Sequence, residues 1–503
     1  MVEDGKHYFL SRPRRFGKSL FLDTLKELFE GNEPLFEGLS IHDHWDWSVR
    51  HPVVRLDFGS GRPQGPDGLQ GDTIAQLDTI ASAAGVEVRY ESAEARFRHL
   101  LQALHERSGR RVAVLVDEYD KPILDALETP AAARANRDYL HGLYSTIKSS
   151  DAHVRFTLLT GVSKFSKVSL FSGLNNLKDV TLDPRFSAVC GYTESDLDTV
   201  FAPELPGLDR DALRDWYNGY GWLGDERVYN PFDILLLFDR RQFDAWWFET
   251  GTPSFLVDLL ARRRIGSASL DNLLSQRDLL STFDVDDIAT EALLFQTGYL
   301  TIHGAEPRGG TMYYRLGYPN REVRQSLNES LLRRLTGRPA SLAEHTARLY
   351  DLLQTNDFAG LEALFRALLA SIPYEWHTRN DIARYEGYYA SVFYSCFAAL
   401  GLDVTVEDSS SHGRLDMAVR FHGNVYLFEF KMLDGSAGGR PSSPDEAAEE
   451  PPASGRSGGR AMAQWKRRGY ADKYRHLDQP IHLIAVEVDR ETRNLASWEV
   501  ERA

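Results

Sequence analysis

Cysteine is scarce in this chain, and long apolar runs are absent from its sequence. Cys190 and Cys396 are the two cysteines among 503 residues, and neither stands in a metal-ligand spacing. So few thiols exclude a disulfide framework and predict a reducing, cytoplasmic setting in which both cysteines pack in the core. No apolar run reaches the roughly 18 residues that a membrane helix needs, and the first residues carry no secretory pattern. We therefore expect no membrane association.

The chain also lacks an excess of positive charge. Its 58 Lys and Arg residues face 73 Asp and Glu, a formal net charge of −15, which disfavours a protein coated in basic surface. Local charge differs near the C-terminus, where one predicted helix carries Trp465, Tyr470 and five basic residues: Lys466, Arg467, Arg468, Lys473 and Arg475. This pattern suits a surface that follows a phosphate backbone, and it also suits an ordinary solvated helix face.

Two acids and a lysine stand in apolar surroundings near the C-terminus. Glu429 and Lys431 are two apart in the aromatic stretch 427–431, which predicts a buried strand with both charges on one face. If His422-Gly423 forms a two-residue hairpin turn, Asp416 stands opposite Glu429 with β-carbons roughly 5 Å apart. Carboxylates so close favour a cation between them, and Mg²⁺ binds one or two carboxylates with water and phosphate oxygens. The alternative is a solvated hairpin with an ordinary ion pair.

The Asp…Glu-x-Lys pattern resembles the core of the PD-(D/E)xK nuclease superfamily. Glu386 lies near the start of a predicted amphipathic helix before the strands, where that superfamily often has a further acid, and a basic helix at 464–474 follows them. The resemblance implies that Asp416, Glu429 and Glu386 serve the metal, with the Phe430 carbonyl as a further ligand. It implies that Lys431 orients the attacking water or stabilises charge on the phosphate.

A Gly-Lys-Ser turn near the N-terminus follows a short predicted strand at 6–10. Gly17, Lys18 and Ser19 supply a phosphate-binding turn, a lysine for the β- and γ-phosphates and a hydroxyl for Mg²⁺. Arg12 replaces the usual first glycine of this pattern, so a basic surface turn is the alternative. We expect seven residues of this segment to bind nucleotide: Arg14, Arg15, Phe16, Gly17, Lys18, Ser19 and Leu20.

A second phosphate-site pattern follows in the apolar run 112–116, which is typical of a buried parallel strand and ends in Asp117 and Glu118. We expect Asp117 to hold Mg²⁺ through water and Glu118 to polarise the hydrolytic water. The alternative is a pair of helix-capping acids. A third run, 155–164, contains Thr160 and Ser163, which are candidates to sense the γ-phosphate.

These motifs together resemble the bacterial AAA-ATPase-like family with an appended PD-(D/E)xK domain. Further matching segments are Arg55–Phe58, Gly161–Ser166, Trp216–Tyr220, Tyr229–Phe232 and Leu316–Val323. The family tolerates the missing first glycine, and its sheet has an additional strand. Members normally carry a further segment before the phosphate-loop strand. The short start of this sequence is therefore expected to cost contacts with the adenine of the nucleotide. A second departure is the segment 435–460, whose Gly, Ser, Pro and acidic composition predicts a disordered insertion.

We predict a multidomain α/β protein. Strands near Tyr8 and at 53–58, 112–116, 156–160 and 179–182 alternate with helices at 95–106 and 133–149, which indicates a parallel-sheet core. Helices at 194–201, 209–217 and 231–238 resemble the lid of an AAA-like module. The predicted segments are a P-loop ATPase core at 1–192, a helical lid at 193–288, a winged-helix-like region at 289–340, a helical connector at 341–380 and a nuclease-like domain at 381–503.

The two sites predict an ATP-regulated, Mg²⁺-dependent endonuclease acting on DNA. ATP at Lys18 and Glu118 is expected to move the lid and so gate the metal site at Glu429. The expected cofactors are ATP and Mg²⁺, and the expected partners are DNA and ATP. Two alternatives stay open. In one, the protein is a nucleotide-controlled signalling or defence switch with an inactive, nuclease-like recognition module; in the other, nucleotide is structural and cleavage is unregulated.

Overall fold

The chain divides into two units: Met1–Gly251 with Asn272–Asn320, and Thr252–Asp271 with Arg321–Ala503. The structure is a computed structural model. It describes residues 1–59, 61, 65–127, 129–164, 170–249, 254–263, 265–276, 289–336, 339–372, 386–410, 413–433 and 470–503. The predicted insertion at 435–460 and the basic residues Lys466, Arg467 and Arg468 lie outside this range.

Five parallel strands form the sheet of the first unit. They are β1 (His7–Ser11), β2 (Val53–Asp57), β3 (Val112–Asp117), β4 (Val154–Gly161) and β5 (Lys178–Asp179). Their order is β2-β3-β4-β1-β5. Strands are found at all five predicted places, although β5 covers Lys178–Asp179 and not the predicted 179–182, and β4 lies between the phosphate-loop strand and the strand that ends in Asp117. This is the additional-strand arrangement that the resemblance implies.

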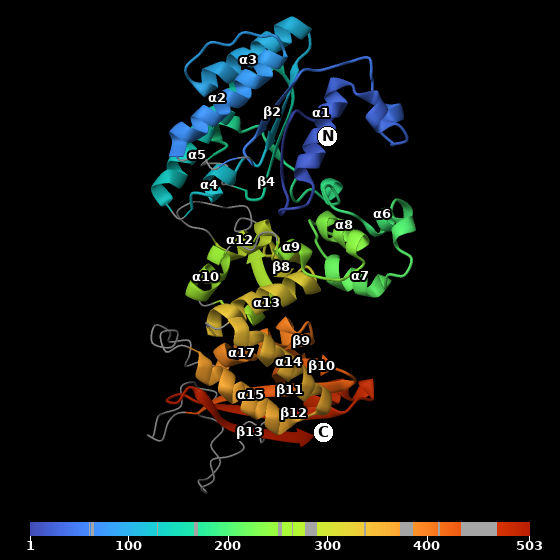
Figure 1. The fold of residues 1–503 in the computed structure, drawn as a ribbon, viewed down its shortest axis with the longest axis vertical. Helices are drawn as coiled ribbons and strands as arrows, with labels where there is room; N and C mark the ends of the chain where they lie inside the picture. The colour runs from blue at the N-terminus through green and yellow to red at the C-terminus, as the bar shows by residue number, and fades with distance from the viewer. Residues whose placement is uncertain are drawn as a thin grey trace. The chain divides into compact units, whose positions relative to one another are not determined.

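Helices cover both faces of this sheet (Figure 1). Helix α1 (Lys18–Glu30) covers one face, where Leu22, Leu25 and Phe29 join Tyr8 and Leu10 in a buried cluster. The predicted helices at 95–106 and 133–149 are confirmed on the other face. Helices there are α2 (Gly65–Ala83), α3 (Ala93–Ser108) and α5 (Pro130–Ser149), with the short α4 (Lys121–Leu124) after β3.

The three helices predicted after residue 193 are confirmed. They are α6 (Glu194–Thr199), α7 (Arg210–Tyr217) and α8 (Pro231–Arg240), and α9 (Trp246–Glu249) follows them. Leu197, Leu213, Tyr217 and Ile234 form their shared core. Short 3-10 helices in this unit are η1 (Glu33–Phe36), η2 (His42–His44), η3 (Asp151–His153), η4 (Ser172–Leu174), η5 (Pro184–Phe186) and η6 (Ala202–Glu204).

A small antiparallel sheet completes the first unit. Its strands, in the order β6-β8-β7, are β6 (Leu273–Gln276), β7 (Thr301–Arg308) and β8 (Thr311–Gly317), and α12 (Thr290–Thr297) precedes β7. Gly309 and Gly310, with φ of 57° and 85°, form the turn between β7 and β8. Most of α12 is buried, which suits an internal scaffold. The winged-helix assignment stays a prediction, as do the segment boundaries.

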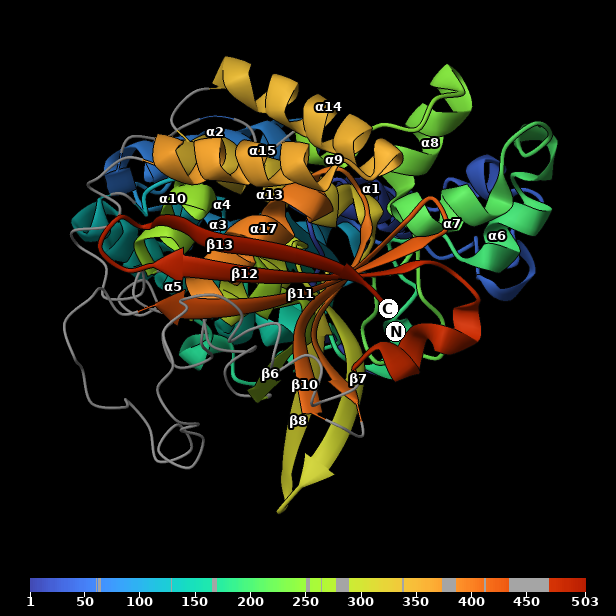
Figure 2. The same ribbon diagram turned by 90° about the horizontal axis from the view of Figure 1, so that it is seen from below.

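The second unit is a five-stranded mixed sheet with helices (Figure 2). The strands are β9 (Asp403–Ser410), β10 (Gly413–Phe421), β11 (Asn424–Leu433), β12 (Ile481–Asp489) and β13 (Asn494–Arg502), in the order β13-β12-β11-β10-β9. β11 and β12 run parallel, and the other neighbours are antiparallel. The helices are α10 (Ser254–Arg263), α13 (Arg321–Thr336), α14 (Pro339–Thr355), α15 (Phe358–Ser371), α17 (Glu386–Ala399), η7 (Ser267–Asn272) and η10 (Tyr470–Leu477). Within the described residues, no helix is long and apolar enough to cross a membrane.

Candidate functional site

The turn between β1 and α1 has the backbone of a phosphate loop. Arg15 and Gly17 adopt the left-handed conformation, with φ of 65° and 75°. Gly17 caps α1, and the described residues supply neither a side-chain cap nor an acid in the first turn. The N–H groups at this helix end therefore remain available to an anion, which the helix dipole also favours.

The seven predicted nucleotide-binding residues differ in exposure. Arg14, Arg15, Gly17, Ser19 and Leu20 are exposed, whereas Phe16 and Lys18 are buried. The Phe16 ring packs edge-on against Tyr220 and Trp222, so this residue offers a ligand its backbone and not its side chain.

Lys18 is bound by its own loop. Its Nζ donates hydrogen bonds to the carbonyl oxygens of Arg12 at 3.0 Å and Pro13 at 2.9 Å. Burial lowers the pKa of Lys18, while the nearby carboxylates of Glu118 and Asp120 oppose that change. A phosphate could replace the two carbonyls as the partner of this ammonium and would neutralise its charge better.

Asp117 ends β3 and is fixed by its neighbours on both sides. Thr160 on β4 donates its hydroxyl to Asp117 Oδ1 at 3.0 Å. The Arg55 guanidinium of β2 lies 3.6 Å from Asp117 Oδ2. Thr160 is therefore a partner of the predicted metal ligand, and its role as a phosphate sensor stays a prediction. Arg55 was not predicted as a site residue, although its segment matches the family.

Glu118 continues from Asp117 in an uncommon backbone conformation. Its φ is 48°, which L-residues seldom adopt and which turns the chain sharply at the strand end. Burial raises the pKa of its carboxyl, and Lys18 opposes the rise. A raised pKa favours accepting a proton from water, which supports the predicted role of Glu118.

Asp120 is a buried acid of this site that the sequence reasoning missed. It accepts hydrogen bonds from the backbone N–H of Ser163 at 2.6 Å and from the Ser163 hydroxyl at 2.5 Å. It therefore joins the end of β3 to the end of β4, beside Lys18. The available signal was a further acid three residues after Asp117, shortly after the apolar run 112–116 and its two acids.

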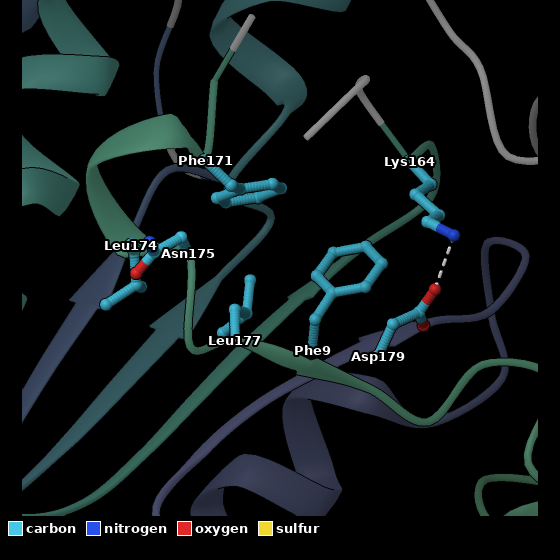
Figure 3. Close-up of a pocket in the computed structure, with 7 residues that line it drawn as sticks. All are labelled: Phe9, Lys164, Phe171, Leu174, Asn175, Leu177 and Asp179. Carbon is cyan, nitrogen blue, oxygen red and sulfur yellow. Dashed lines mark ion pairs between the residues drawn. The ribbon is translucent and has the colours of Figure 1, made fainter. Parts of the chain in front are cut away.

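A small pocket lies beside β1 and β5 in the same unit (Figure 3). Its lining residues are Phe9, Lys164, Phe171, Leu174, Asn175, Leu177 and Asp179. Lys164 Nζ lies 2.5 Å from Asp179 Oδ2, and this ion pair links the segment after β4 to β5. Since the lysine is neutralised and the remaining lining is mostly apolar, the pocket is poorly suited to phosphate.

The predicted hairpin and its register are confirmed in the second unit. His422 and Gly423, with φ of 45° and 72°, form a two-residue turn, as a type I′ hairpin requires. Phe421 pairs with Asn424 and Met417 with Phe428. The paired residues end at Met417 and Phe428, so the facing of Asp416 and Glu429 stays a prediction that extends this register by one residue.

Asp416 is tied to the strand that carries Glu429. Its Oδ2 accepts a hydrogen bond of 2.8 Å from the backbone N–H of Phe430. The Glu429 side chain is 2% exposed. Phe428 and Phe430 contact Phe397 and Phe393 of α17, while Leu427 packs on the opposite face with Ala471 and Tyr474 of η10. Alternation places Glu429 and Lys431 on that opposite face.

Glu487 is a further acid on this face that was not predicted. It is 3% exposed and pairs with Lys431 in the parallel register of β11 and β12. The sequence feature that could have identified Glu487 is the presence of an acid within the apolar run 481–488.

Glu386 is the first residue of α17; its side chain lies outside the described range, so its metal role stays a prediction. Of the predicted basic helix, residues 470–474 are described and belong to η10.

The donor chemistry of both sites fits Mg²⁺. Among the described residues, no group of three or more His, Cys, Asp or Glu side chains is arranged to hold a metal. Ser19 with Asp117, and Asp416 with Glu429, offer hard oxygen ligands in pairs. Mg²⁺ commonly completes such a set with water and phosphate oxygens.

Comparisons with known proteins agree with both halves. A family model described as "Predicted AAA-ATPase" matches residues 1–171, and one for the PD-(D/E)XK nuclease superfamily matches residues 384–498. The chain is 59% identical over 502 residues to an uncharacterized protein in the vnfD 5′ region of Azotobacter chroococcum mcd 1, covering 100% of this chain and 93% of that protein. The name of that relative states no activity.

Proposed function

Because the chain belongs to the family that joins a predicted AAA-ATPase domain to a PD-(D/E)XK nuclease-superfamily domain, we propose that it is an ATP-regulated, Mg²⁺-dependent endonuclease that cleaves DNA. One observation carries the nuclease part: the Asp416 carboxylate is held by the Phe430 N–H on the strand that carries buried Glu429. This hydrogen bond holds Asp416 against the strand that also carries Glu429 and Lys431.

At this site the chain's own residues divide the work. Asp416 and Glu429 would hold Mg²⁺, and the metal would supply a Lewis acid and an activated water. Lys431 would stabilise the negative charge that develops on the phosphate, since an ammonium is a donor and not a ligand.

At the first site, Lys18 would bind the phosphates of ATP, and Ser19 with Asp117 would hold the accompanying Mg²⁺. Glu118 would take a proton from the attacking water. The Thr160 hydroxyl supports this arrangement because it fixes the orientation of Asp117. In the proposal, nucleotide at this site changes the rate of cleavage at the other.

The test is a cleavage assay on supercoiled plasmid and single-stranded DNA, with Mg²⁺ or Mn²⁺, in the presence and absence of ATP. We expect metal-dependent cutting whose rate ATP changes. The matched control is Asp416→Asn, which keeps an acceptor for the Phe430 N–H but weakens a metal site. Absence of cutting in every condition, with ATP hydrolysis intact, would favour the nucleotide-controlled switch instead.

A further inference from the structure

The phosphate loop is held by side chains from the helical segment that follows residue 193. Phe16 is fully buried, with its ring centroid 4.8 Å from that of Tyr220 and 5.5 Å from that of Trp222. Trp247 Nε1 donates a 2.9 Å hydrogen bond to the carbonyl of Arg14. The loop therefore has contacts on the side away from its ligand.

Arg12, which stands in place of the usual glycine, makes several long-range contacts of its own. Its side chain is fully buried. Nη1 donates to the Thr181 carbonyl at 3.1 Å, Nη2 to that of Phe186 at 2.8 Å, and Nε to that of Val189 at 3.1 Å. Its guanidinium carbon lies 4.1 Å from the ring centroid of Trp222. A planar fork can serve these acceptors and an aromatic face at once, which an ammonium cannot do.

The same residue meets the phosphate-binding lysine through its backbone. The Arg12 carbonyl accepts the 3.0 Å hydrogen bond from Lys18 Nζ. A phosphate that takes Lys18 as its partner would remove that bond, and a shift of the released Arg12 backbone would move its guanidinium against Trp222. Arg12 thus contacts Lys18 through its backbone, while its side chain joins the carbonyls of residues 181–189 to the ring of Trp222.

We propose that Arg12 is the positioning residue of the phosphate loop and that it transmits the state of Lys18 to Trp222 and the helical segment 194–249. This rests on the proposed binding of ATP at the loop. A link of this kind requires that the ligand interact differently with the two states, and the Lys18 bond to Arg12 is the interaction that differs.

The first experiment follows tryptophan emission of the full chain while Mg²⁺ and a non-hydrolysable ATP analogue are added, with calorimetry of the same titration. We expect a saturable change in wild type that Trp222→Phe largely removes. Trp216→Phe is the matched control, because Trp216 packs on Phe243 in the same segment. It should keep the change, and both variants should bind nucleotide.

The second experiment compares Arg12→Lys with Arg227→Lys. Arg227 also binds backbone carbonyls, those of Gly219, Ile302 and His303, none of which belongs to the phosphate loop. We expect Arg12→Lys to raise the nucleotide Kd about tenfold and Arg227→Lys to leave it unchanged at a similar melting temperature. If Arg12→Lys does not fold, the Trp222→Phe titration decides.

Each result has one meaning. If wild type binds no nucleotide by calorimetry, the proposed ATP site fails and this inference fails with it. If wild type binds nucleotide and Trp222→Phe keeps the full emission change, or if the two lysine variants bind equally well, the ATP site stands and the role of Arg12 and Trp222 is overturned.

Discussion

Lys18 Nζ donates a 3.0 Å hydrogen bond to the carbonyl oxygen of Arg12, six residues before it in the same loop. The ammonium that should meet the phosphates therefore has loop carbonyls as its partners in this structure. When nucleotide binds, phosphate oxygens replace these carbonyls as the acceptors of the Lys18 ammonium. The charge is therefore never left buried without a partner.

Lys18→Ala should therefore abolish ATP binding, whereas Glu118→Gln should bind ATP and lose hydrolysis by roughly 10²-fold, the lower range for a lost general base. Calorimetry and phosphate release measure the two effects separately. Lys26→Ala is the control on α1, since Lys26 pairs with Glu27 and Glu30. Equal ATP turnover in wild type and Glu118→Gln would remove Glu118 from the chemistry.

Substitution of the second site should separate metal binding from charge stabilisation. Asp416→Ala and Glu429→Ala should both lose cleavage and weaken Mg²⁺ affinity, with partial recovery at best in excess Mn²⁺. Lys431→Ala should lose cleavage and keep that affinity, because an ammonium cannot ligate a cation. Isothermal titration with Mg²⁺ distinguishes the two classes, and we expect DNA binding to survive in all three. Unchanged Mg²⁺ affinity in Asp416→Ala would contradict the assignment.

Asp416 also has a structural task that the substitutions should reveal. Alanine leaves the Phe430 N–H without its acceptor, which costs about 1–3 kcal/mol for a buried donor. Asparagine keeps the acceptor. Urea unfolding should therefore find Asp416→Ala less stable than Asp416→Asn, and equal stability would show that water replaces the carboxylate.

His7 should make the first unit sensitive to mild acid. The ring is 3% exposed and lies 3.1 Å from the Thr157 hydroxyl and 2.9 Å from Asp151. Burial lowers its pKa below 6.5, and Asp151 opposes the change. The His7 imidazole therefore binds a proton more tightly in the unfolded chain than in the folded one. As pH falls below 6.5, His7 lowers the free energy of unfolding by at most about 1.4 kcal/mol per pH unit.

The measurement is the unfolding free energy of wild type and His7→Gln between pH 7.5 and pH 5, chosen to span the usual histidine range. The substituted protein should show the shallower loss. His44→Gln, an exposed histidine, is the control and should follow wild type. Parallel curves for wild type and His7→Gln would exclude His7 as the source.

The two cysteines should report the unfolding of each unit. Burial raises the pKa of Cys190 to about 11 and that of Cys396 to about 12. Both are then protonated at pH 8 and should react slowly with a thiol reagent. Labelling of Cys190→Ser and Cys396→Ser across a urea series should give one transition each. Cys396 is buried as predicted, whereas Cys190 is partly exposed, so immediate labelling of Cys396 in the native protein would contradict its burial.

Local pattern was sufficient for much of the fold. Continuous apolar runs such as 112–116 marked the parallel strands, and His422-Gly423 specified both a turn and the register that pairs Met417 with Phe428. Long-range side-chain contacts were not accessible in this way. Arg12 binds carbonyls about 170 residues away, and no periodicity encodes that choice. Asp120 depends on a tight turn after β3 that brings it to Ser163, which the sequence does not specify alone.

The position of β1 in the sheet has a consequence for synthesis. Its neighbours are β4 and β5, which begin at Val154 and Lys178, so both of its hydrogen-bonding edges stay unsatisfied while the intervening chain is made. At the usual 5–20 residues per second, that interval is roughly 10–30 s. The strand that precedes the phosphate loop is thus made before both of its neighbours and waits for them to complete its pairing. During that interval the unpaired edges of His7–Ser11 could pair with other chains, and the shortness of this five-residue strand limits that risk.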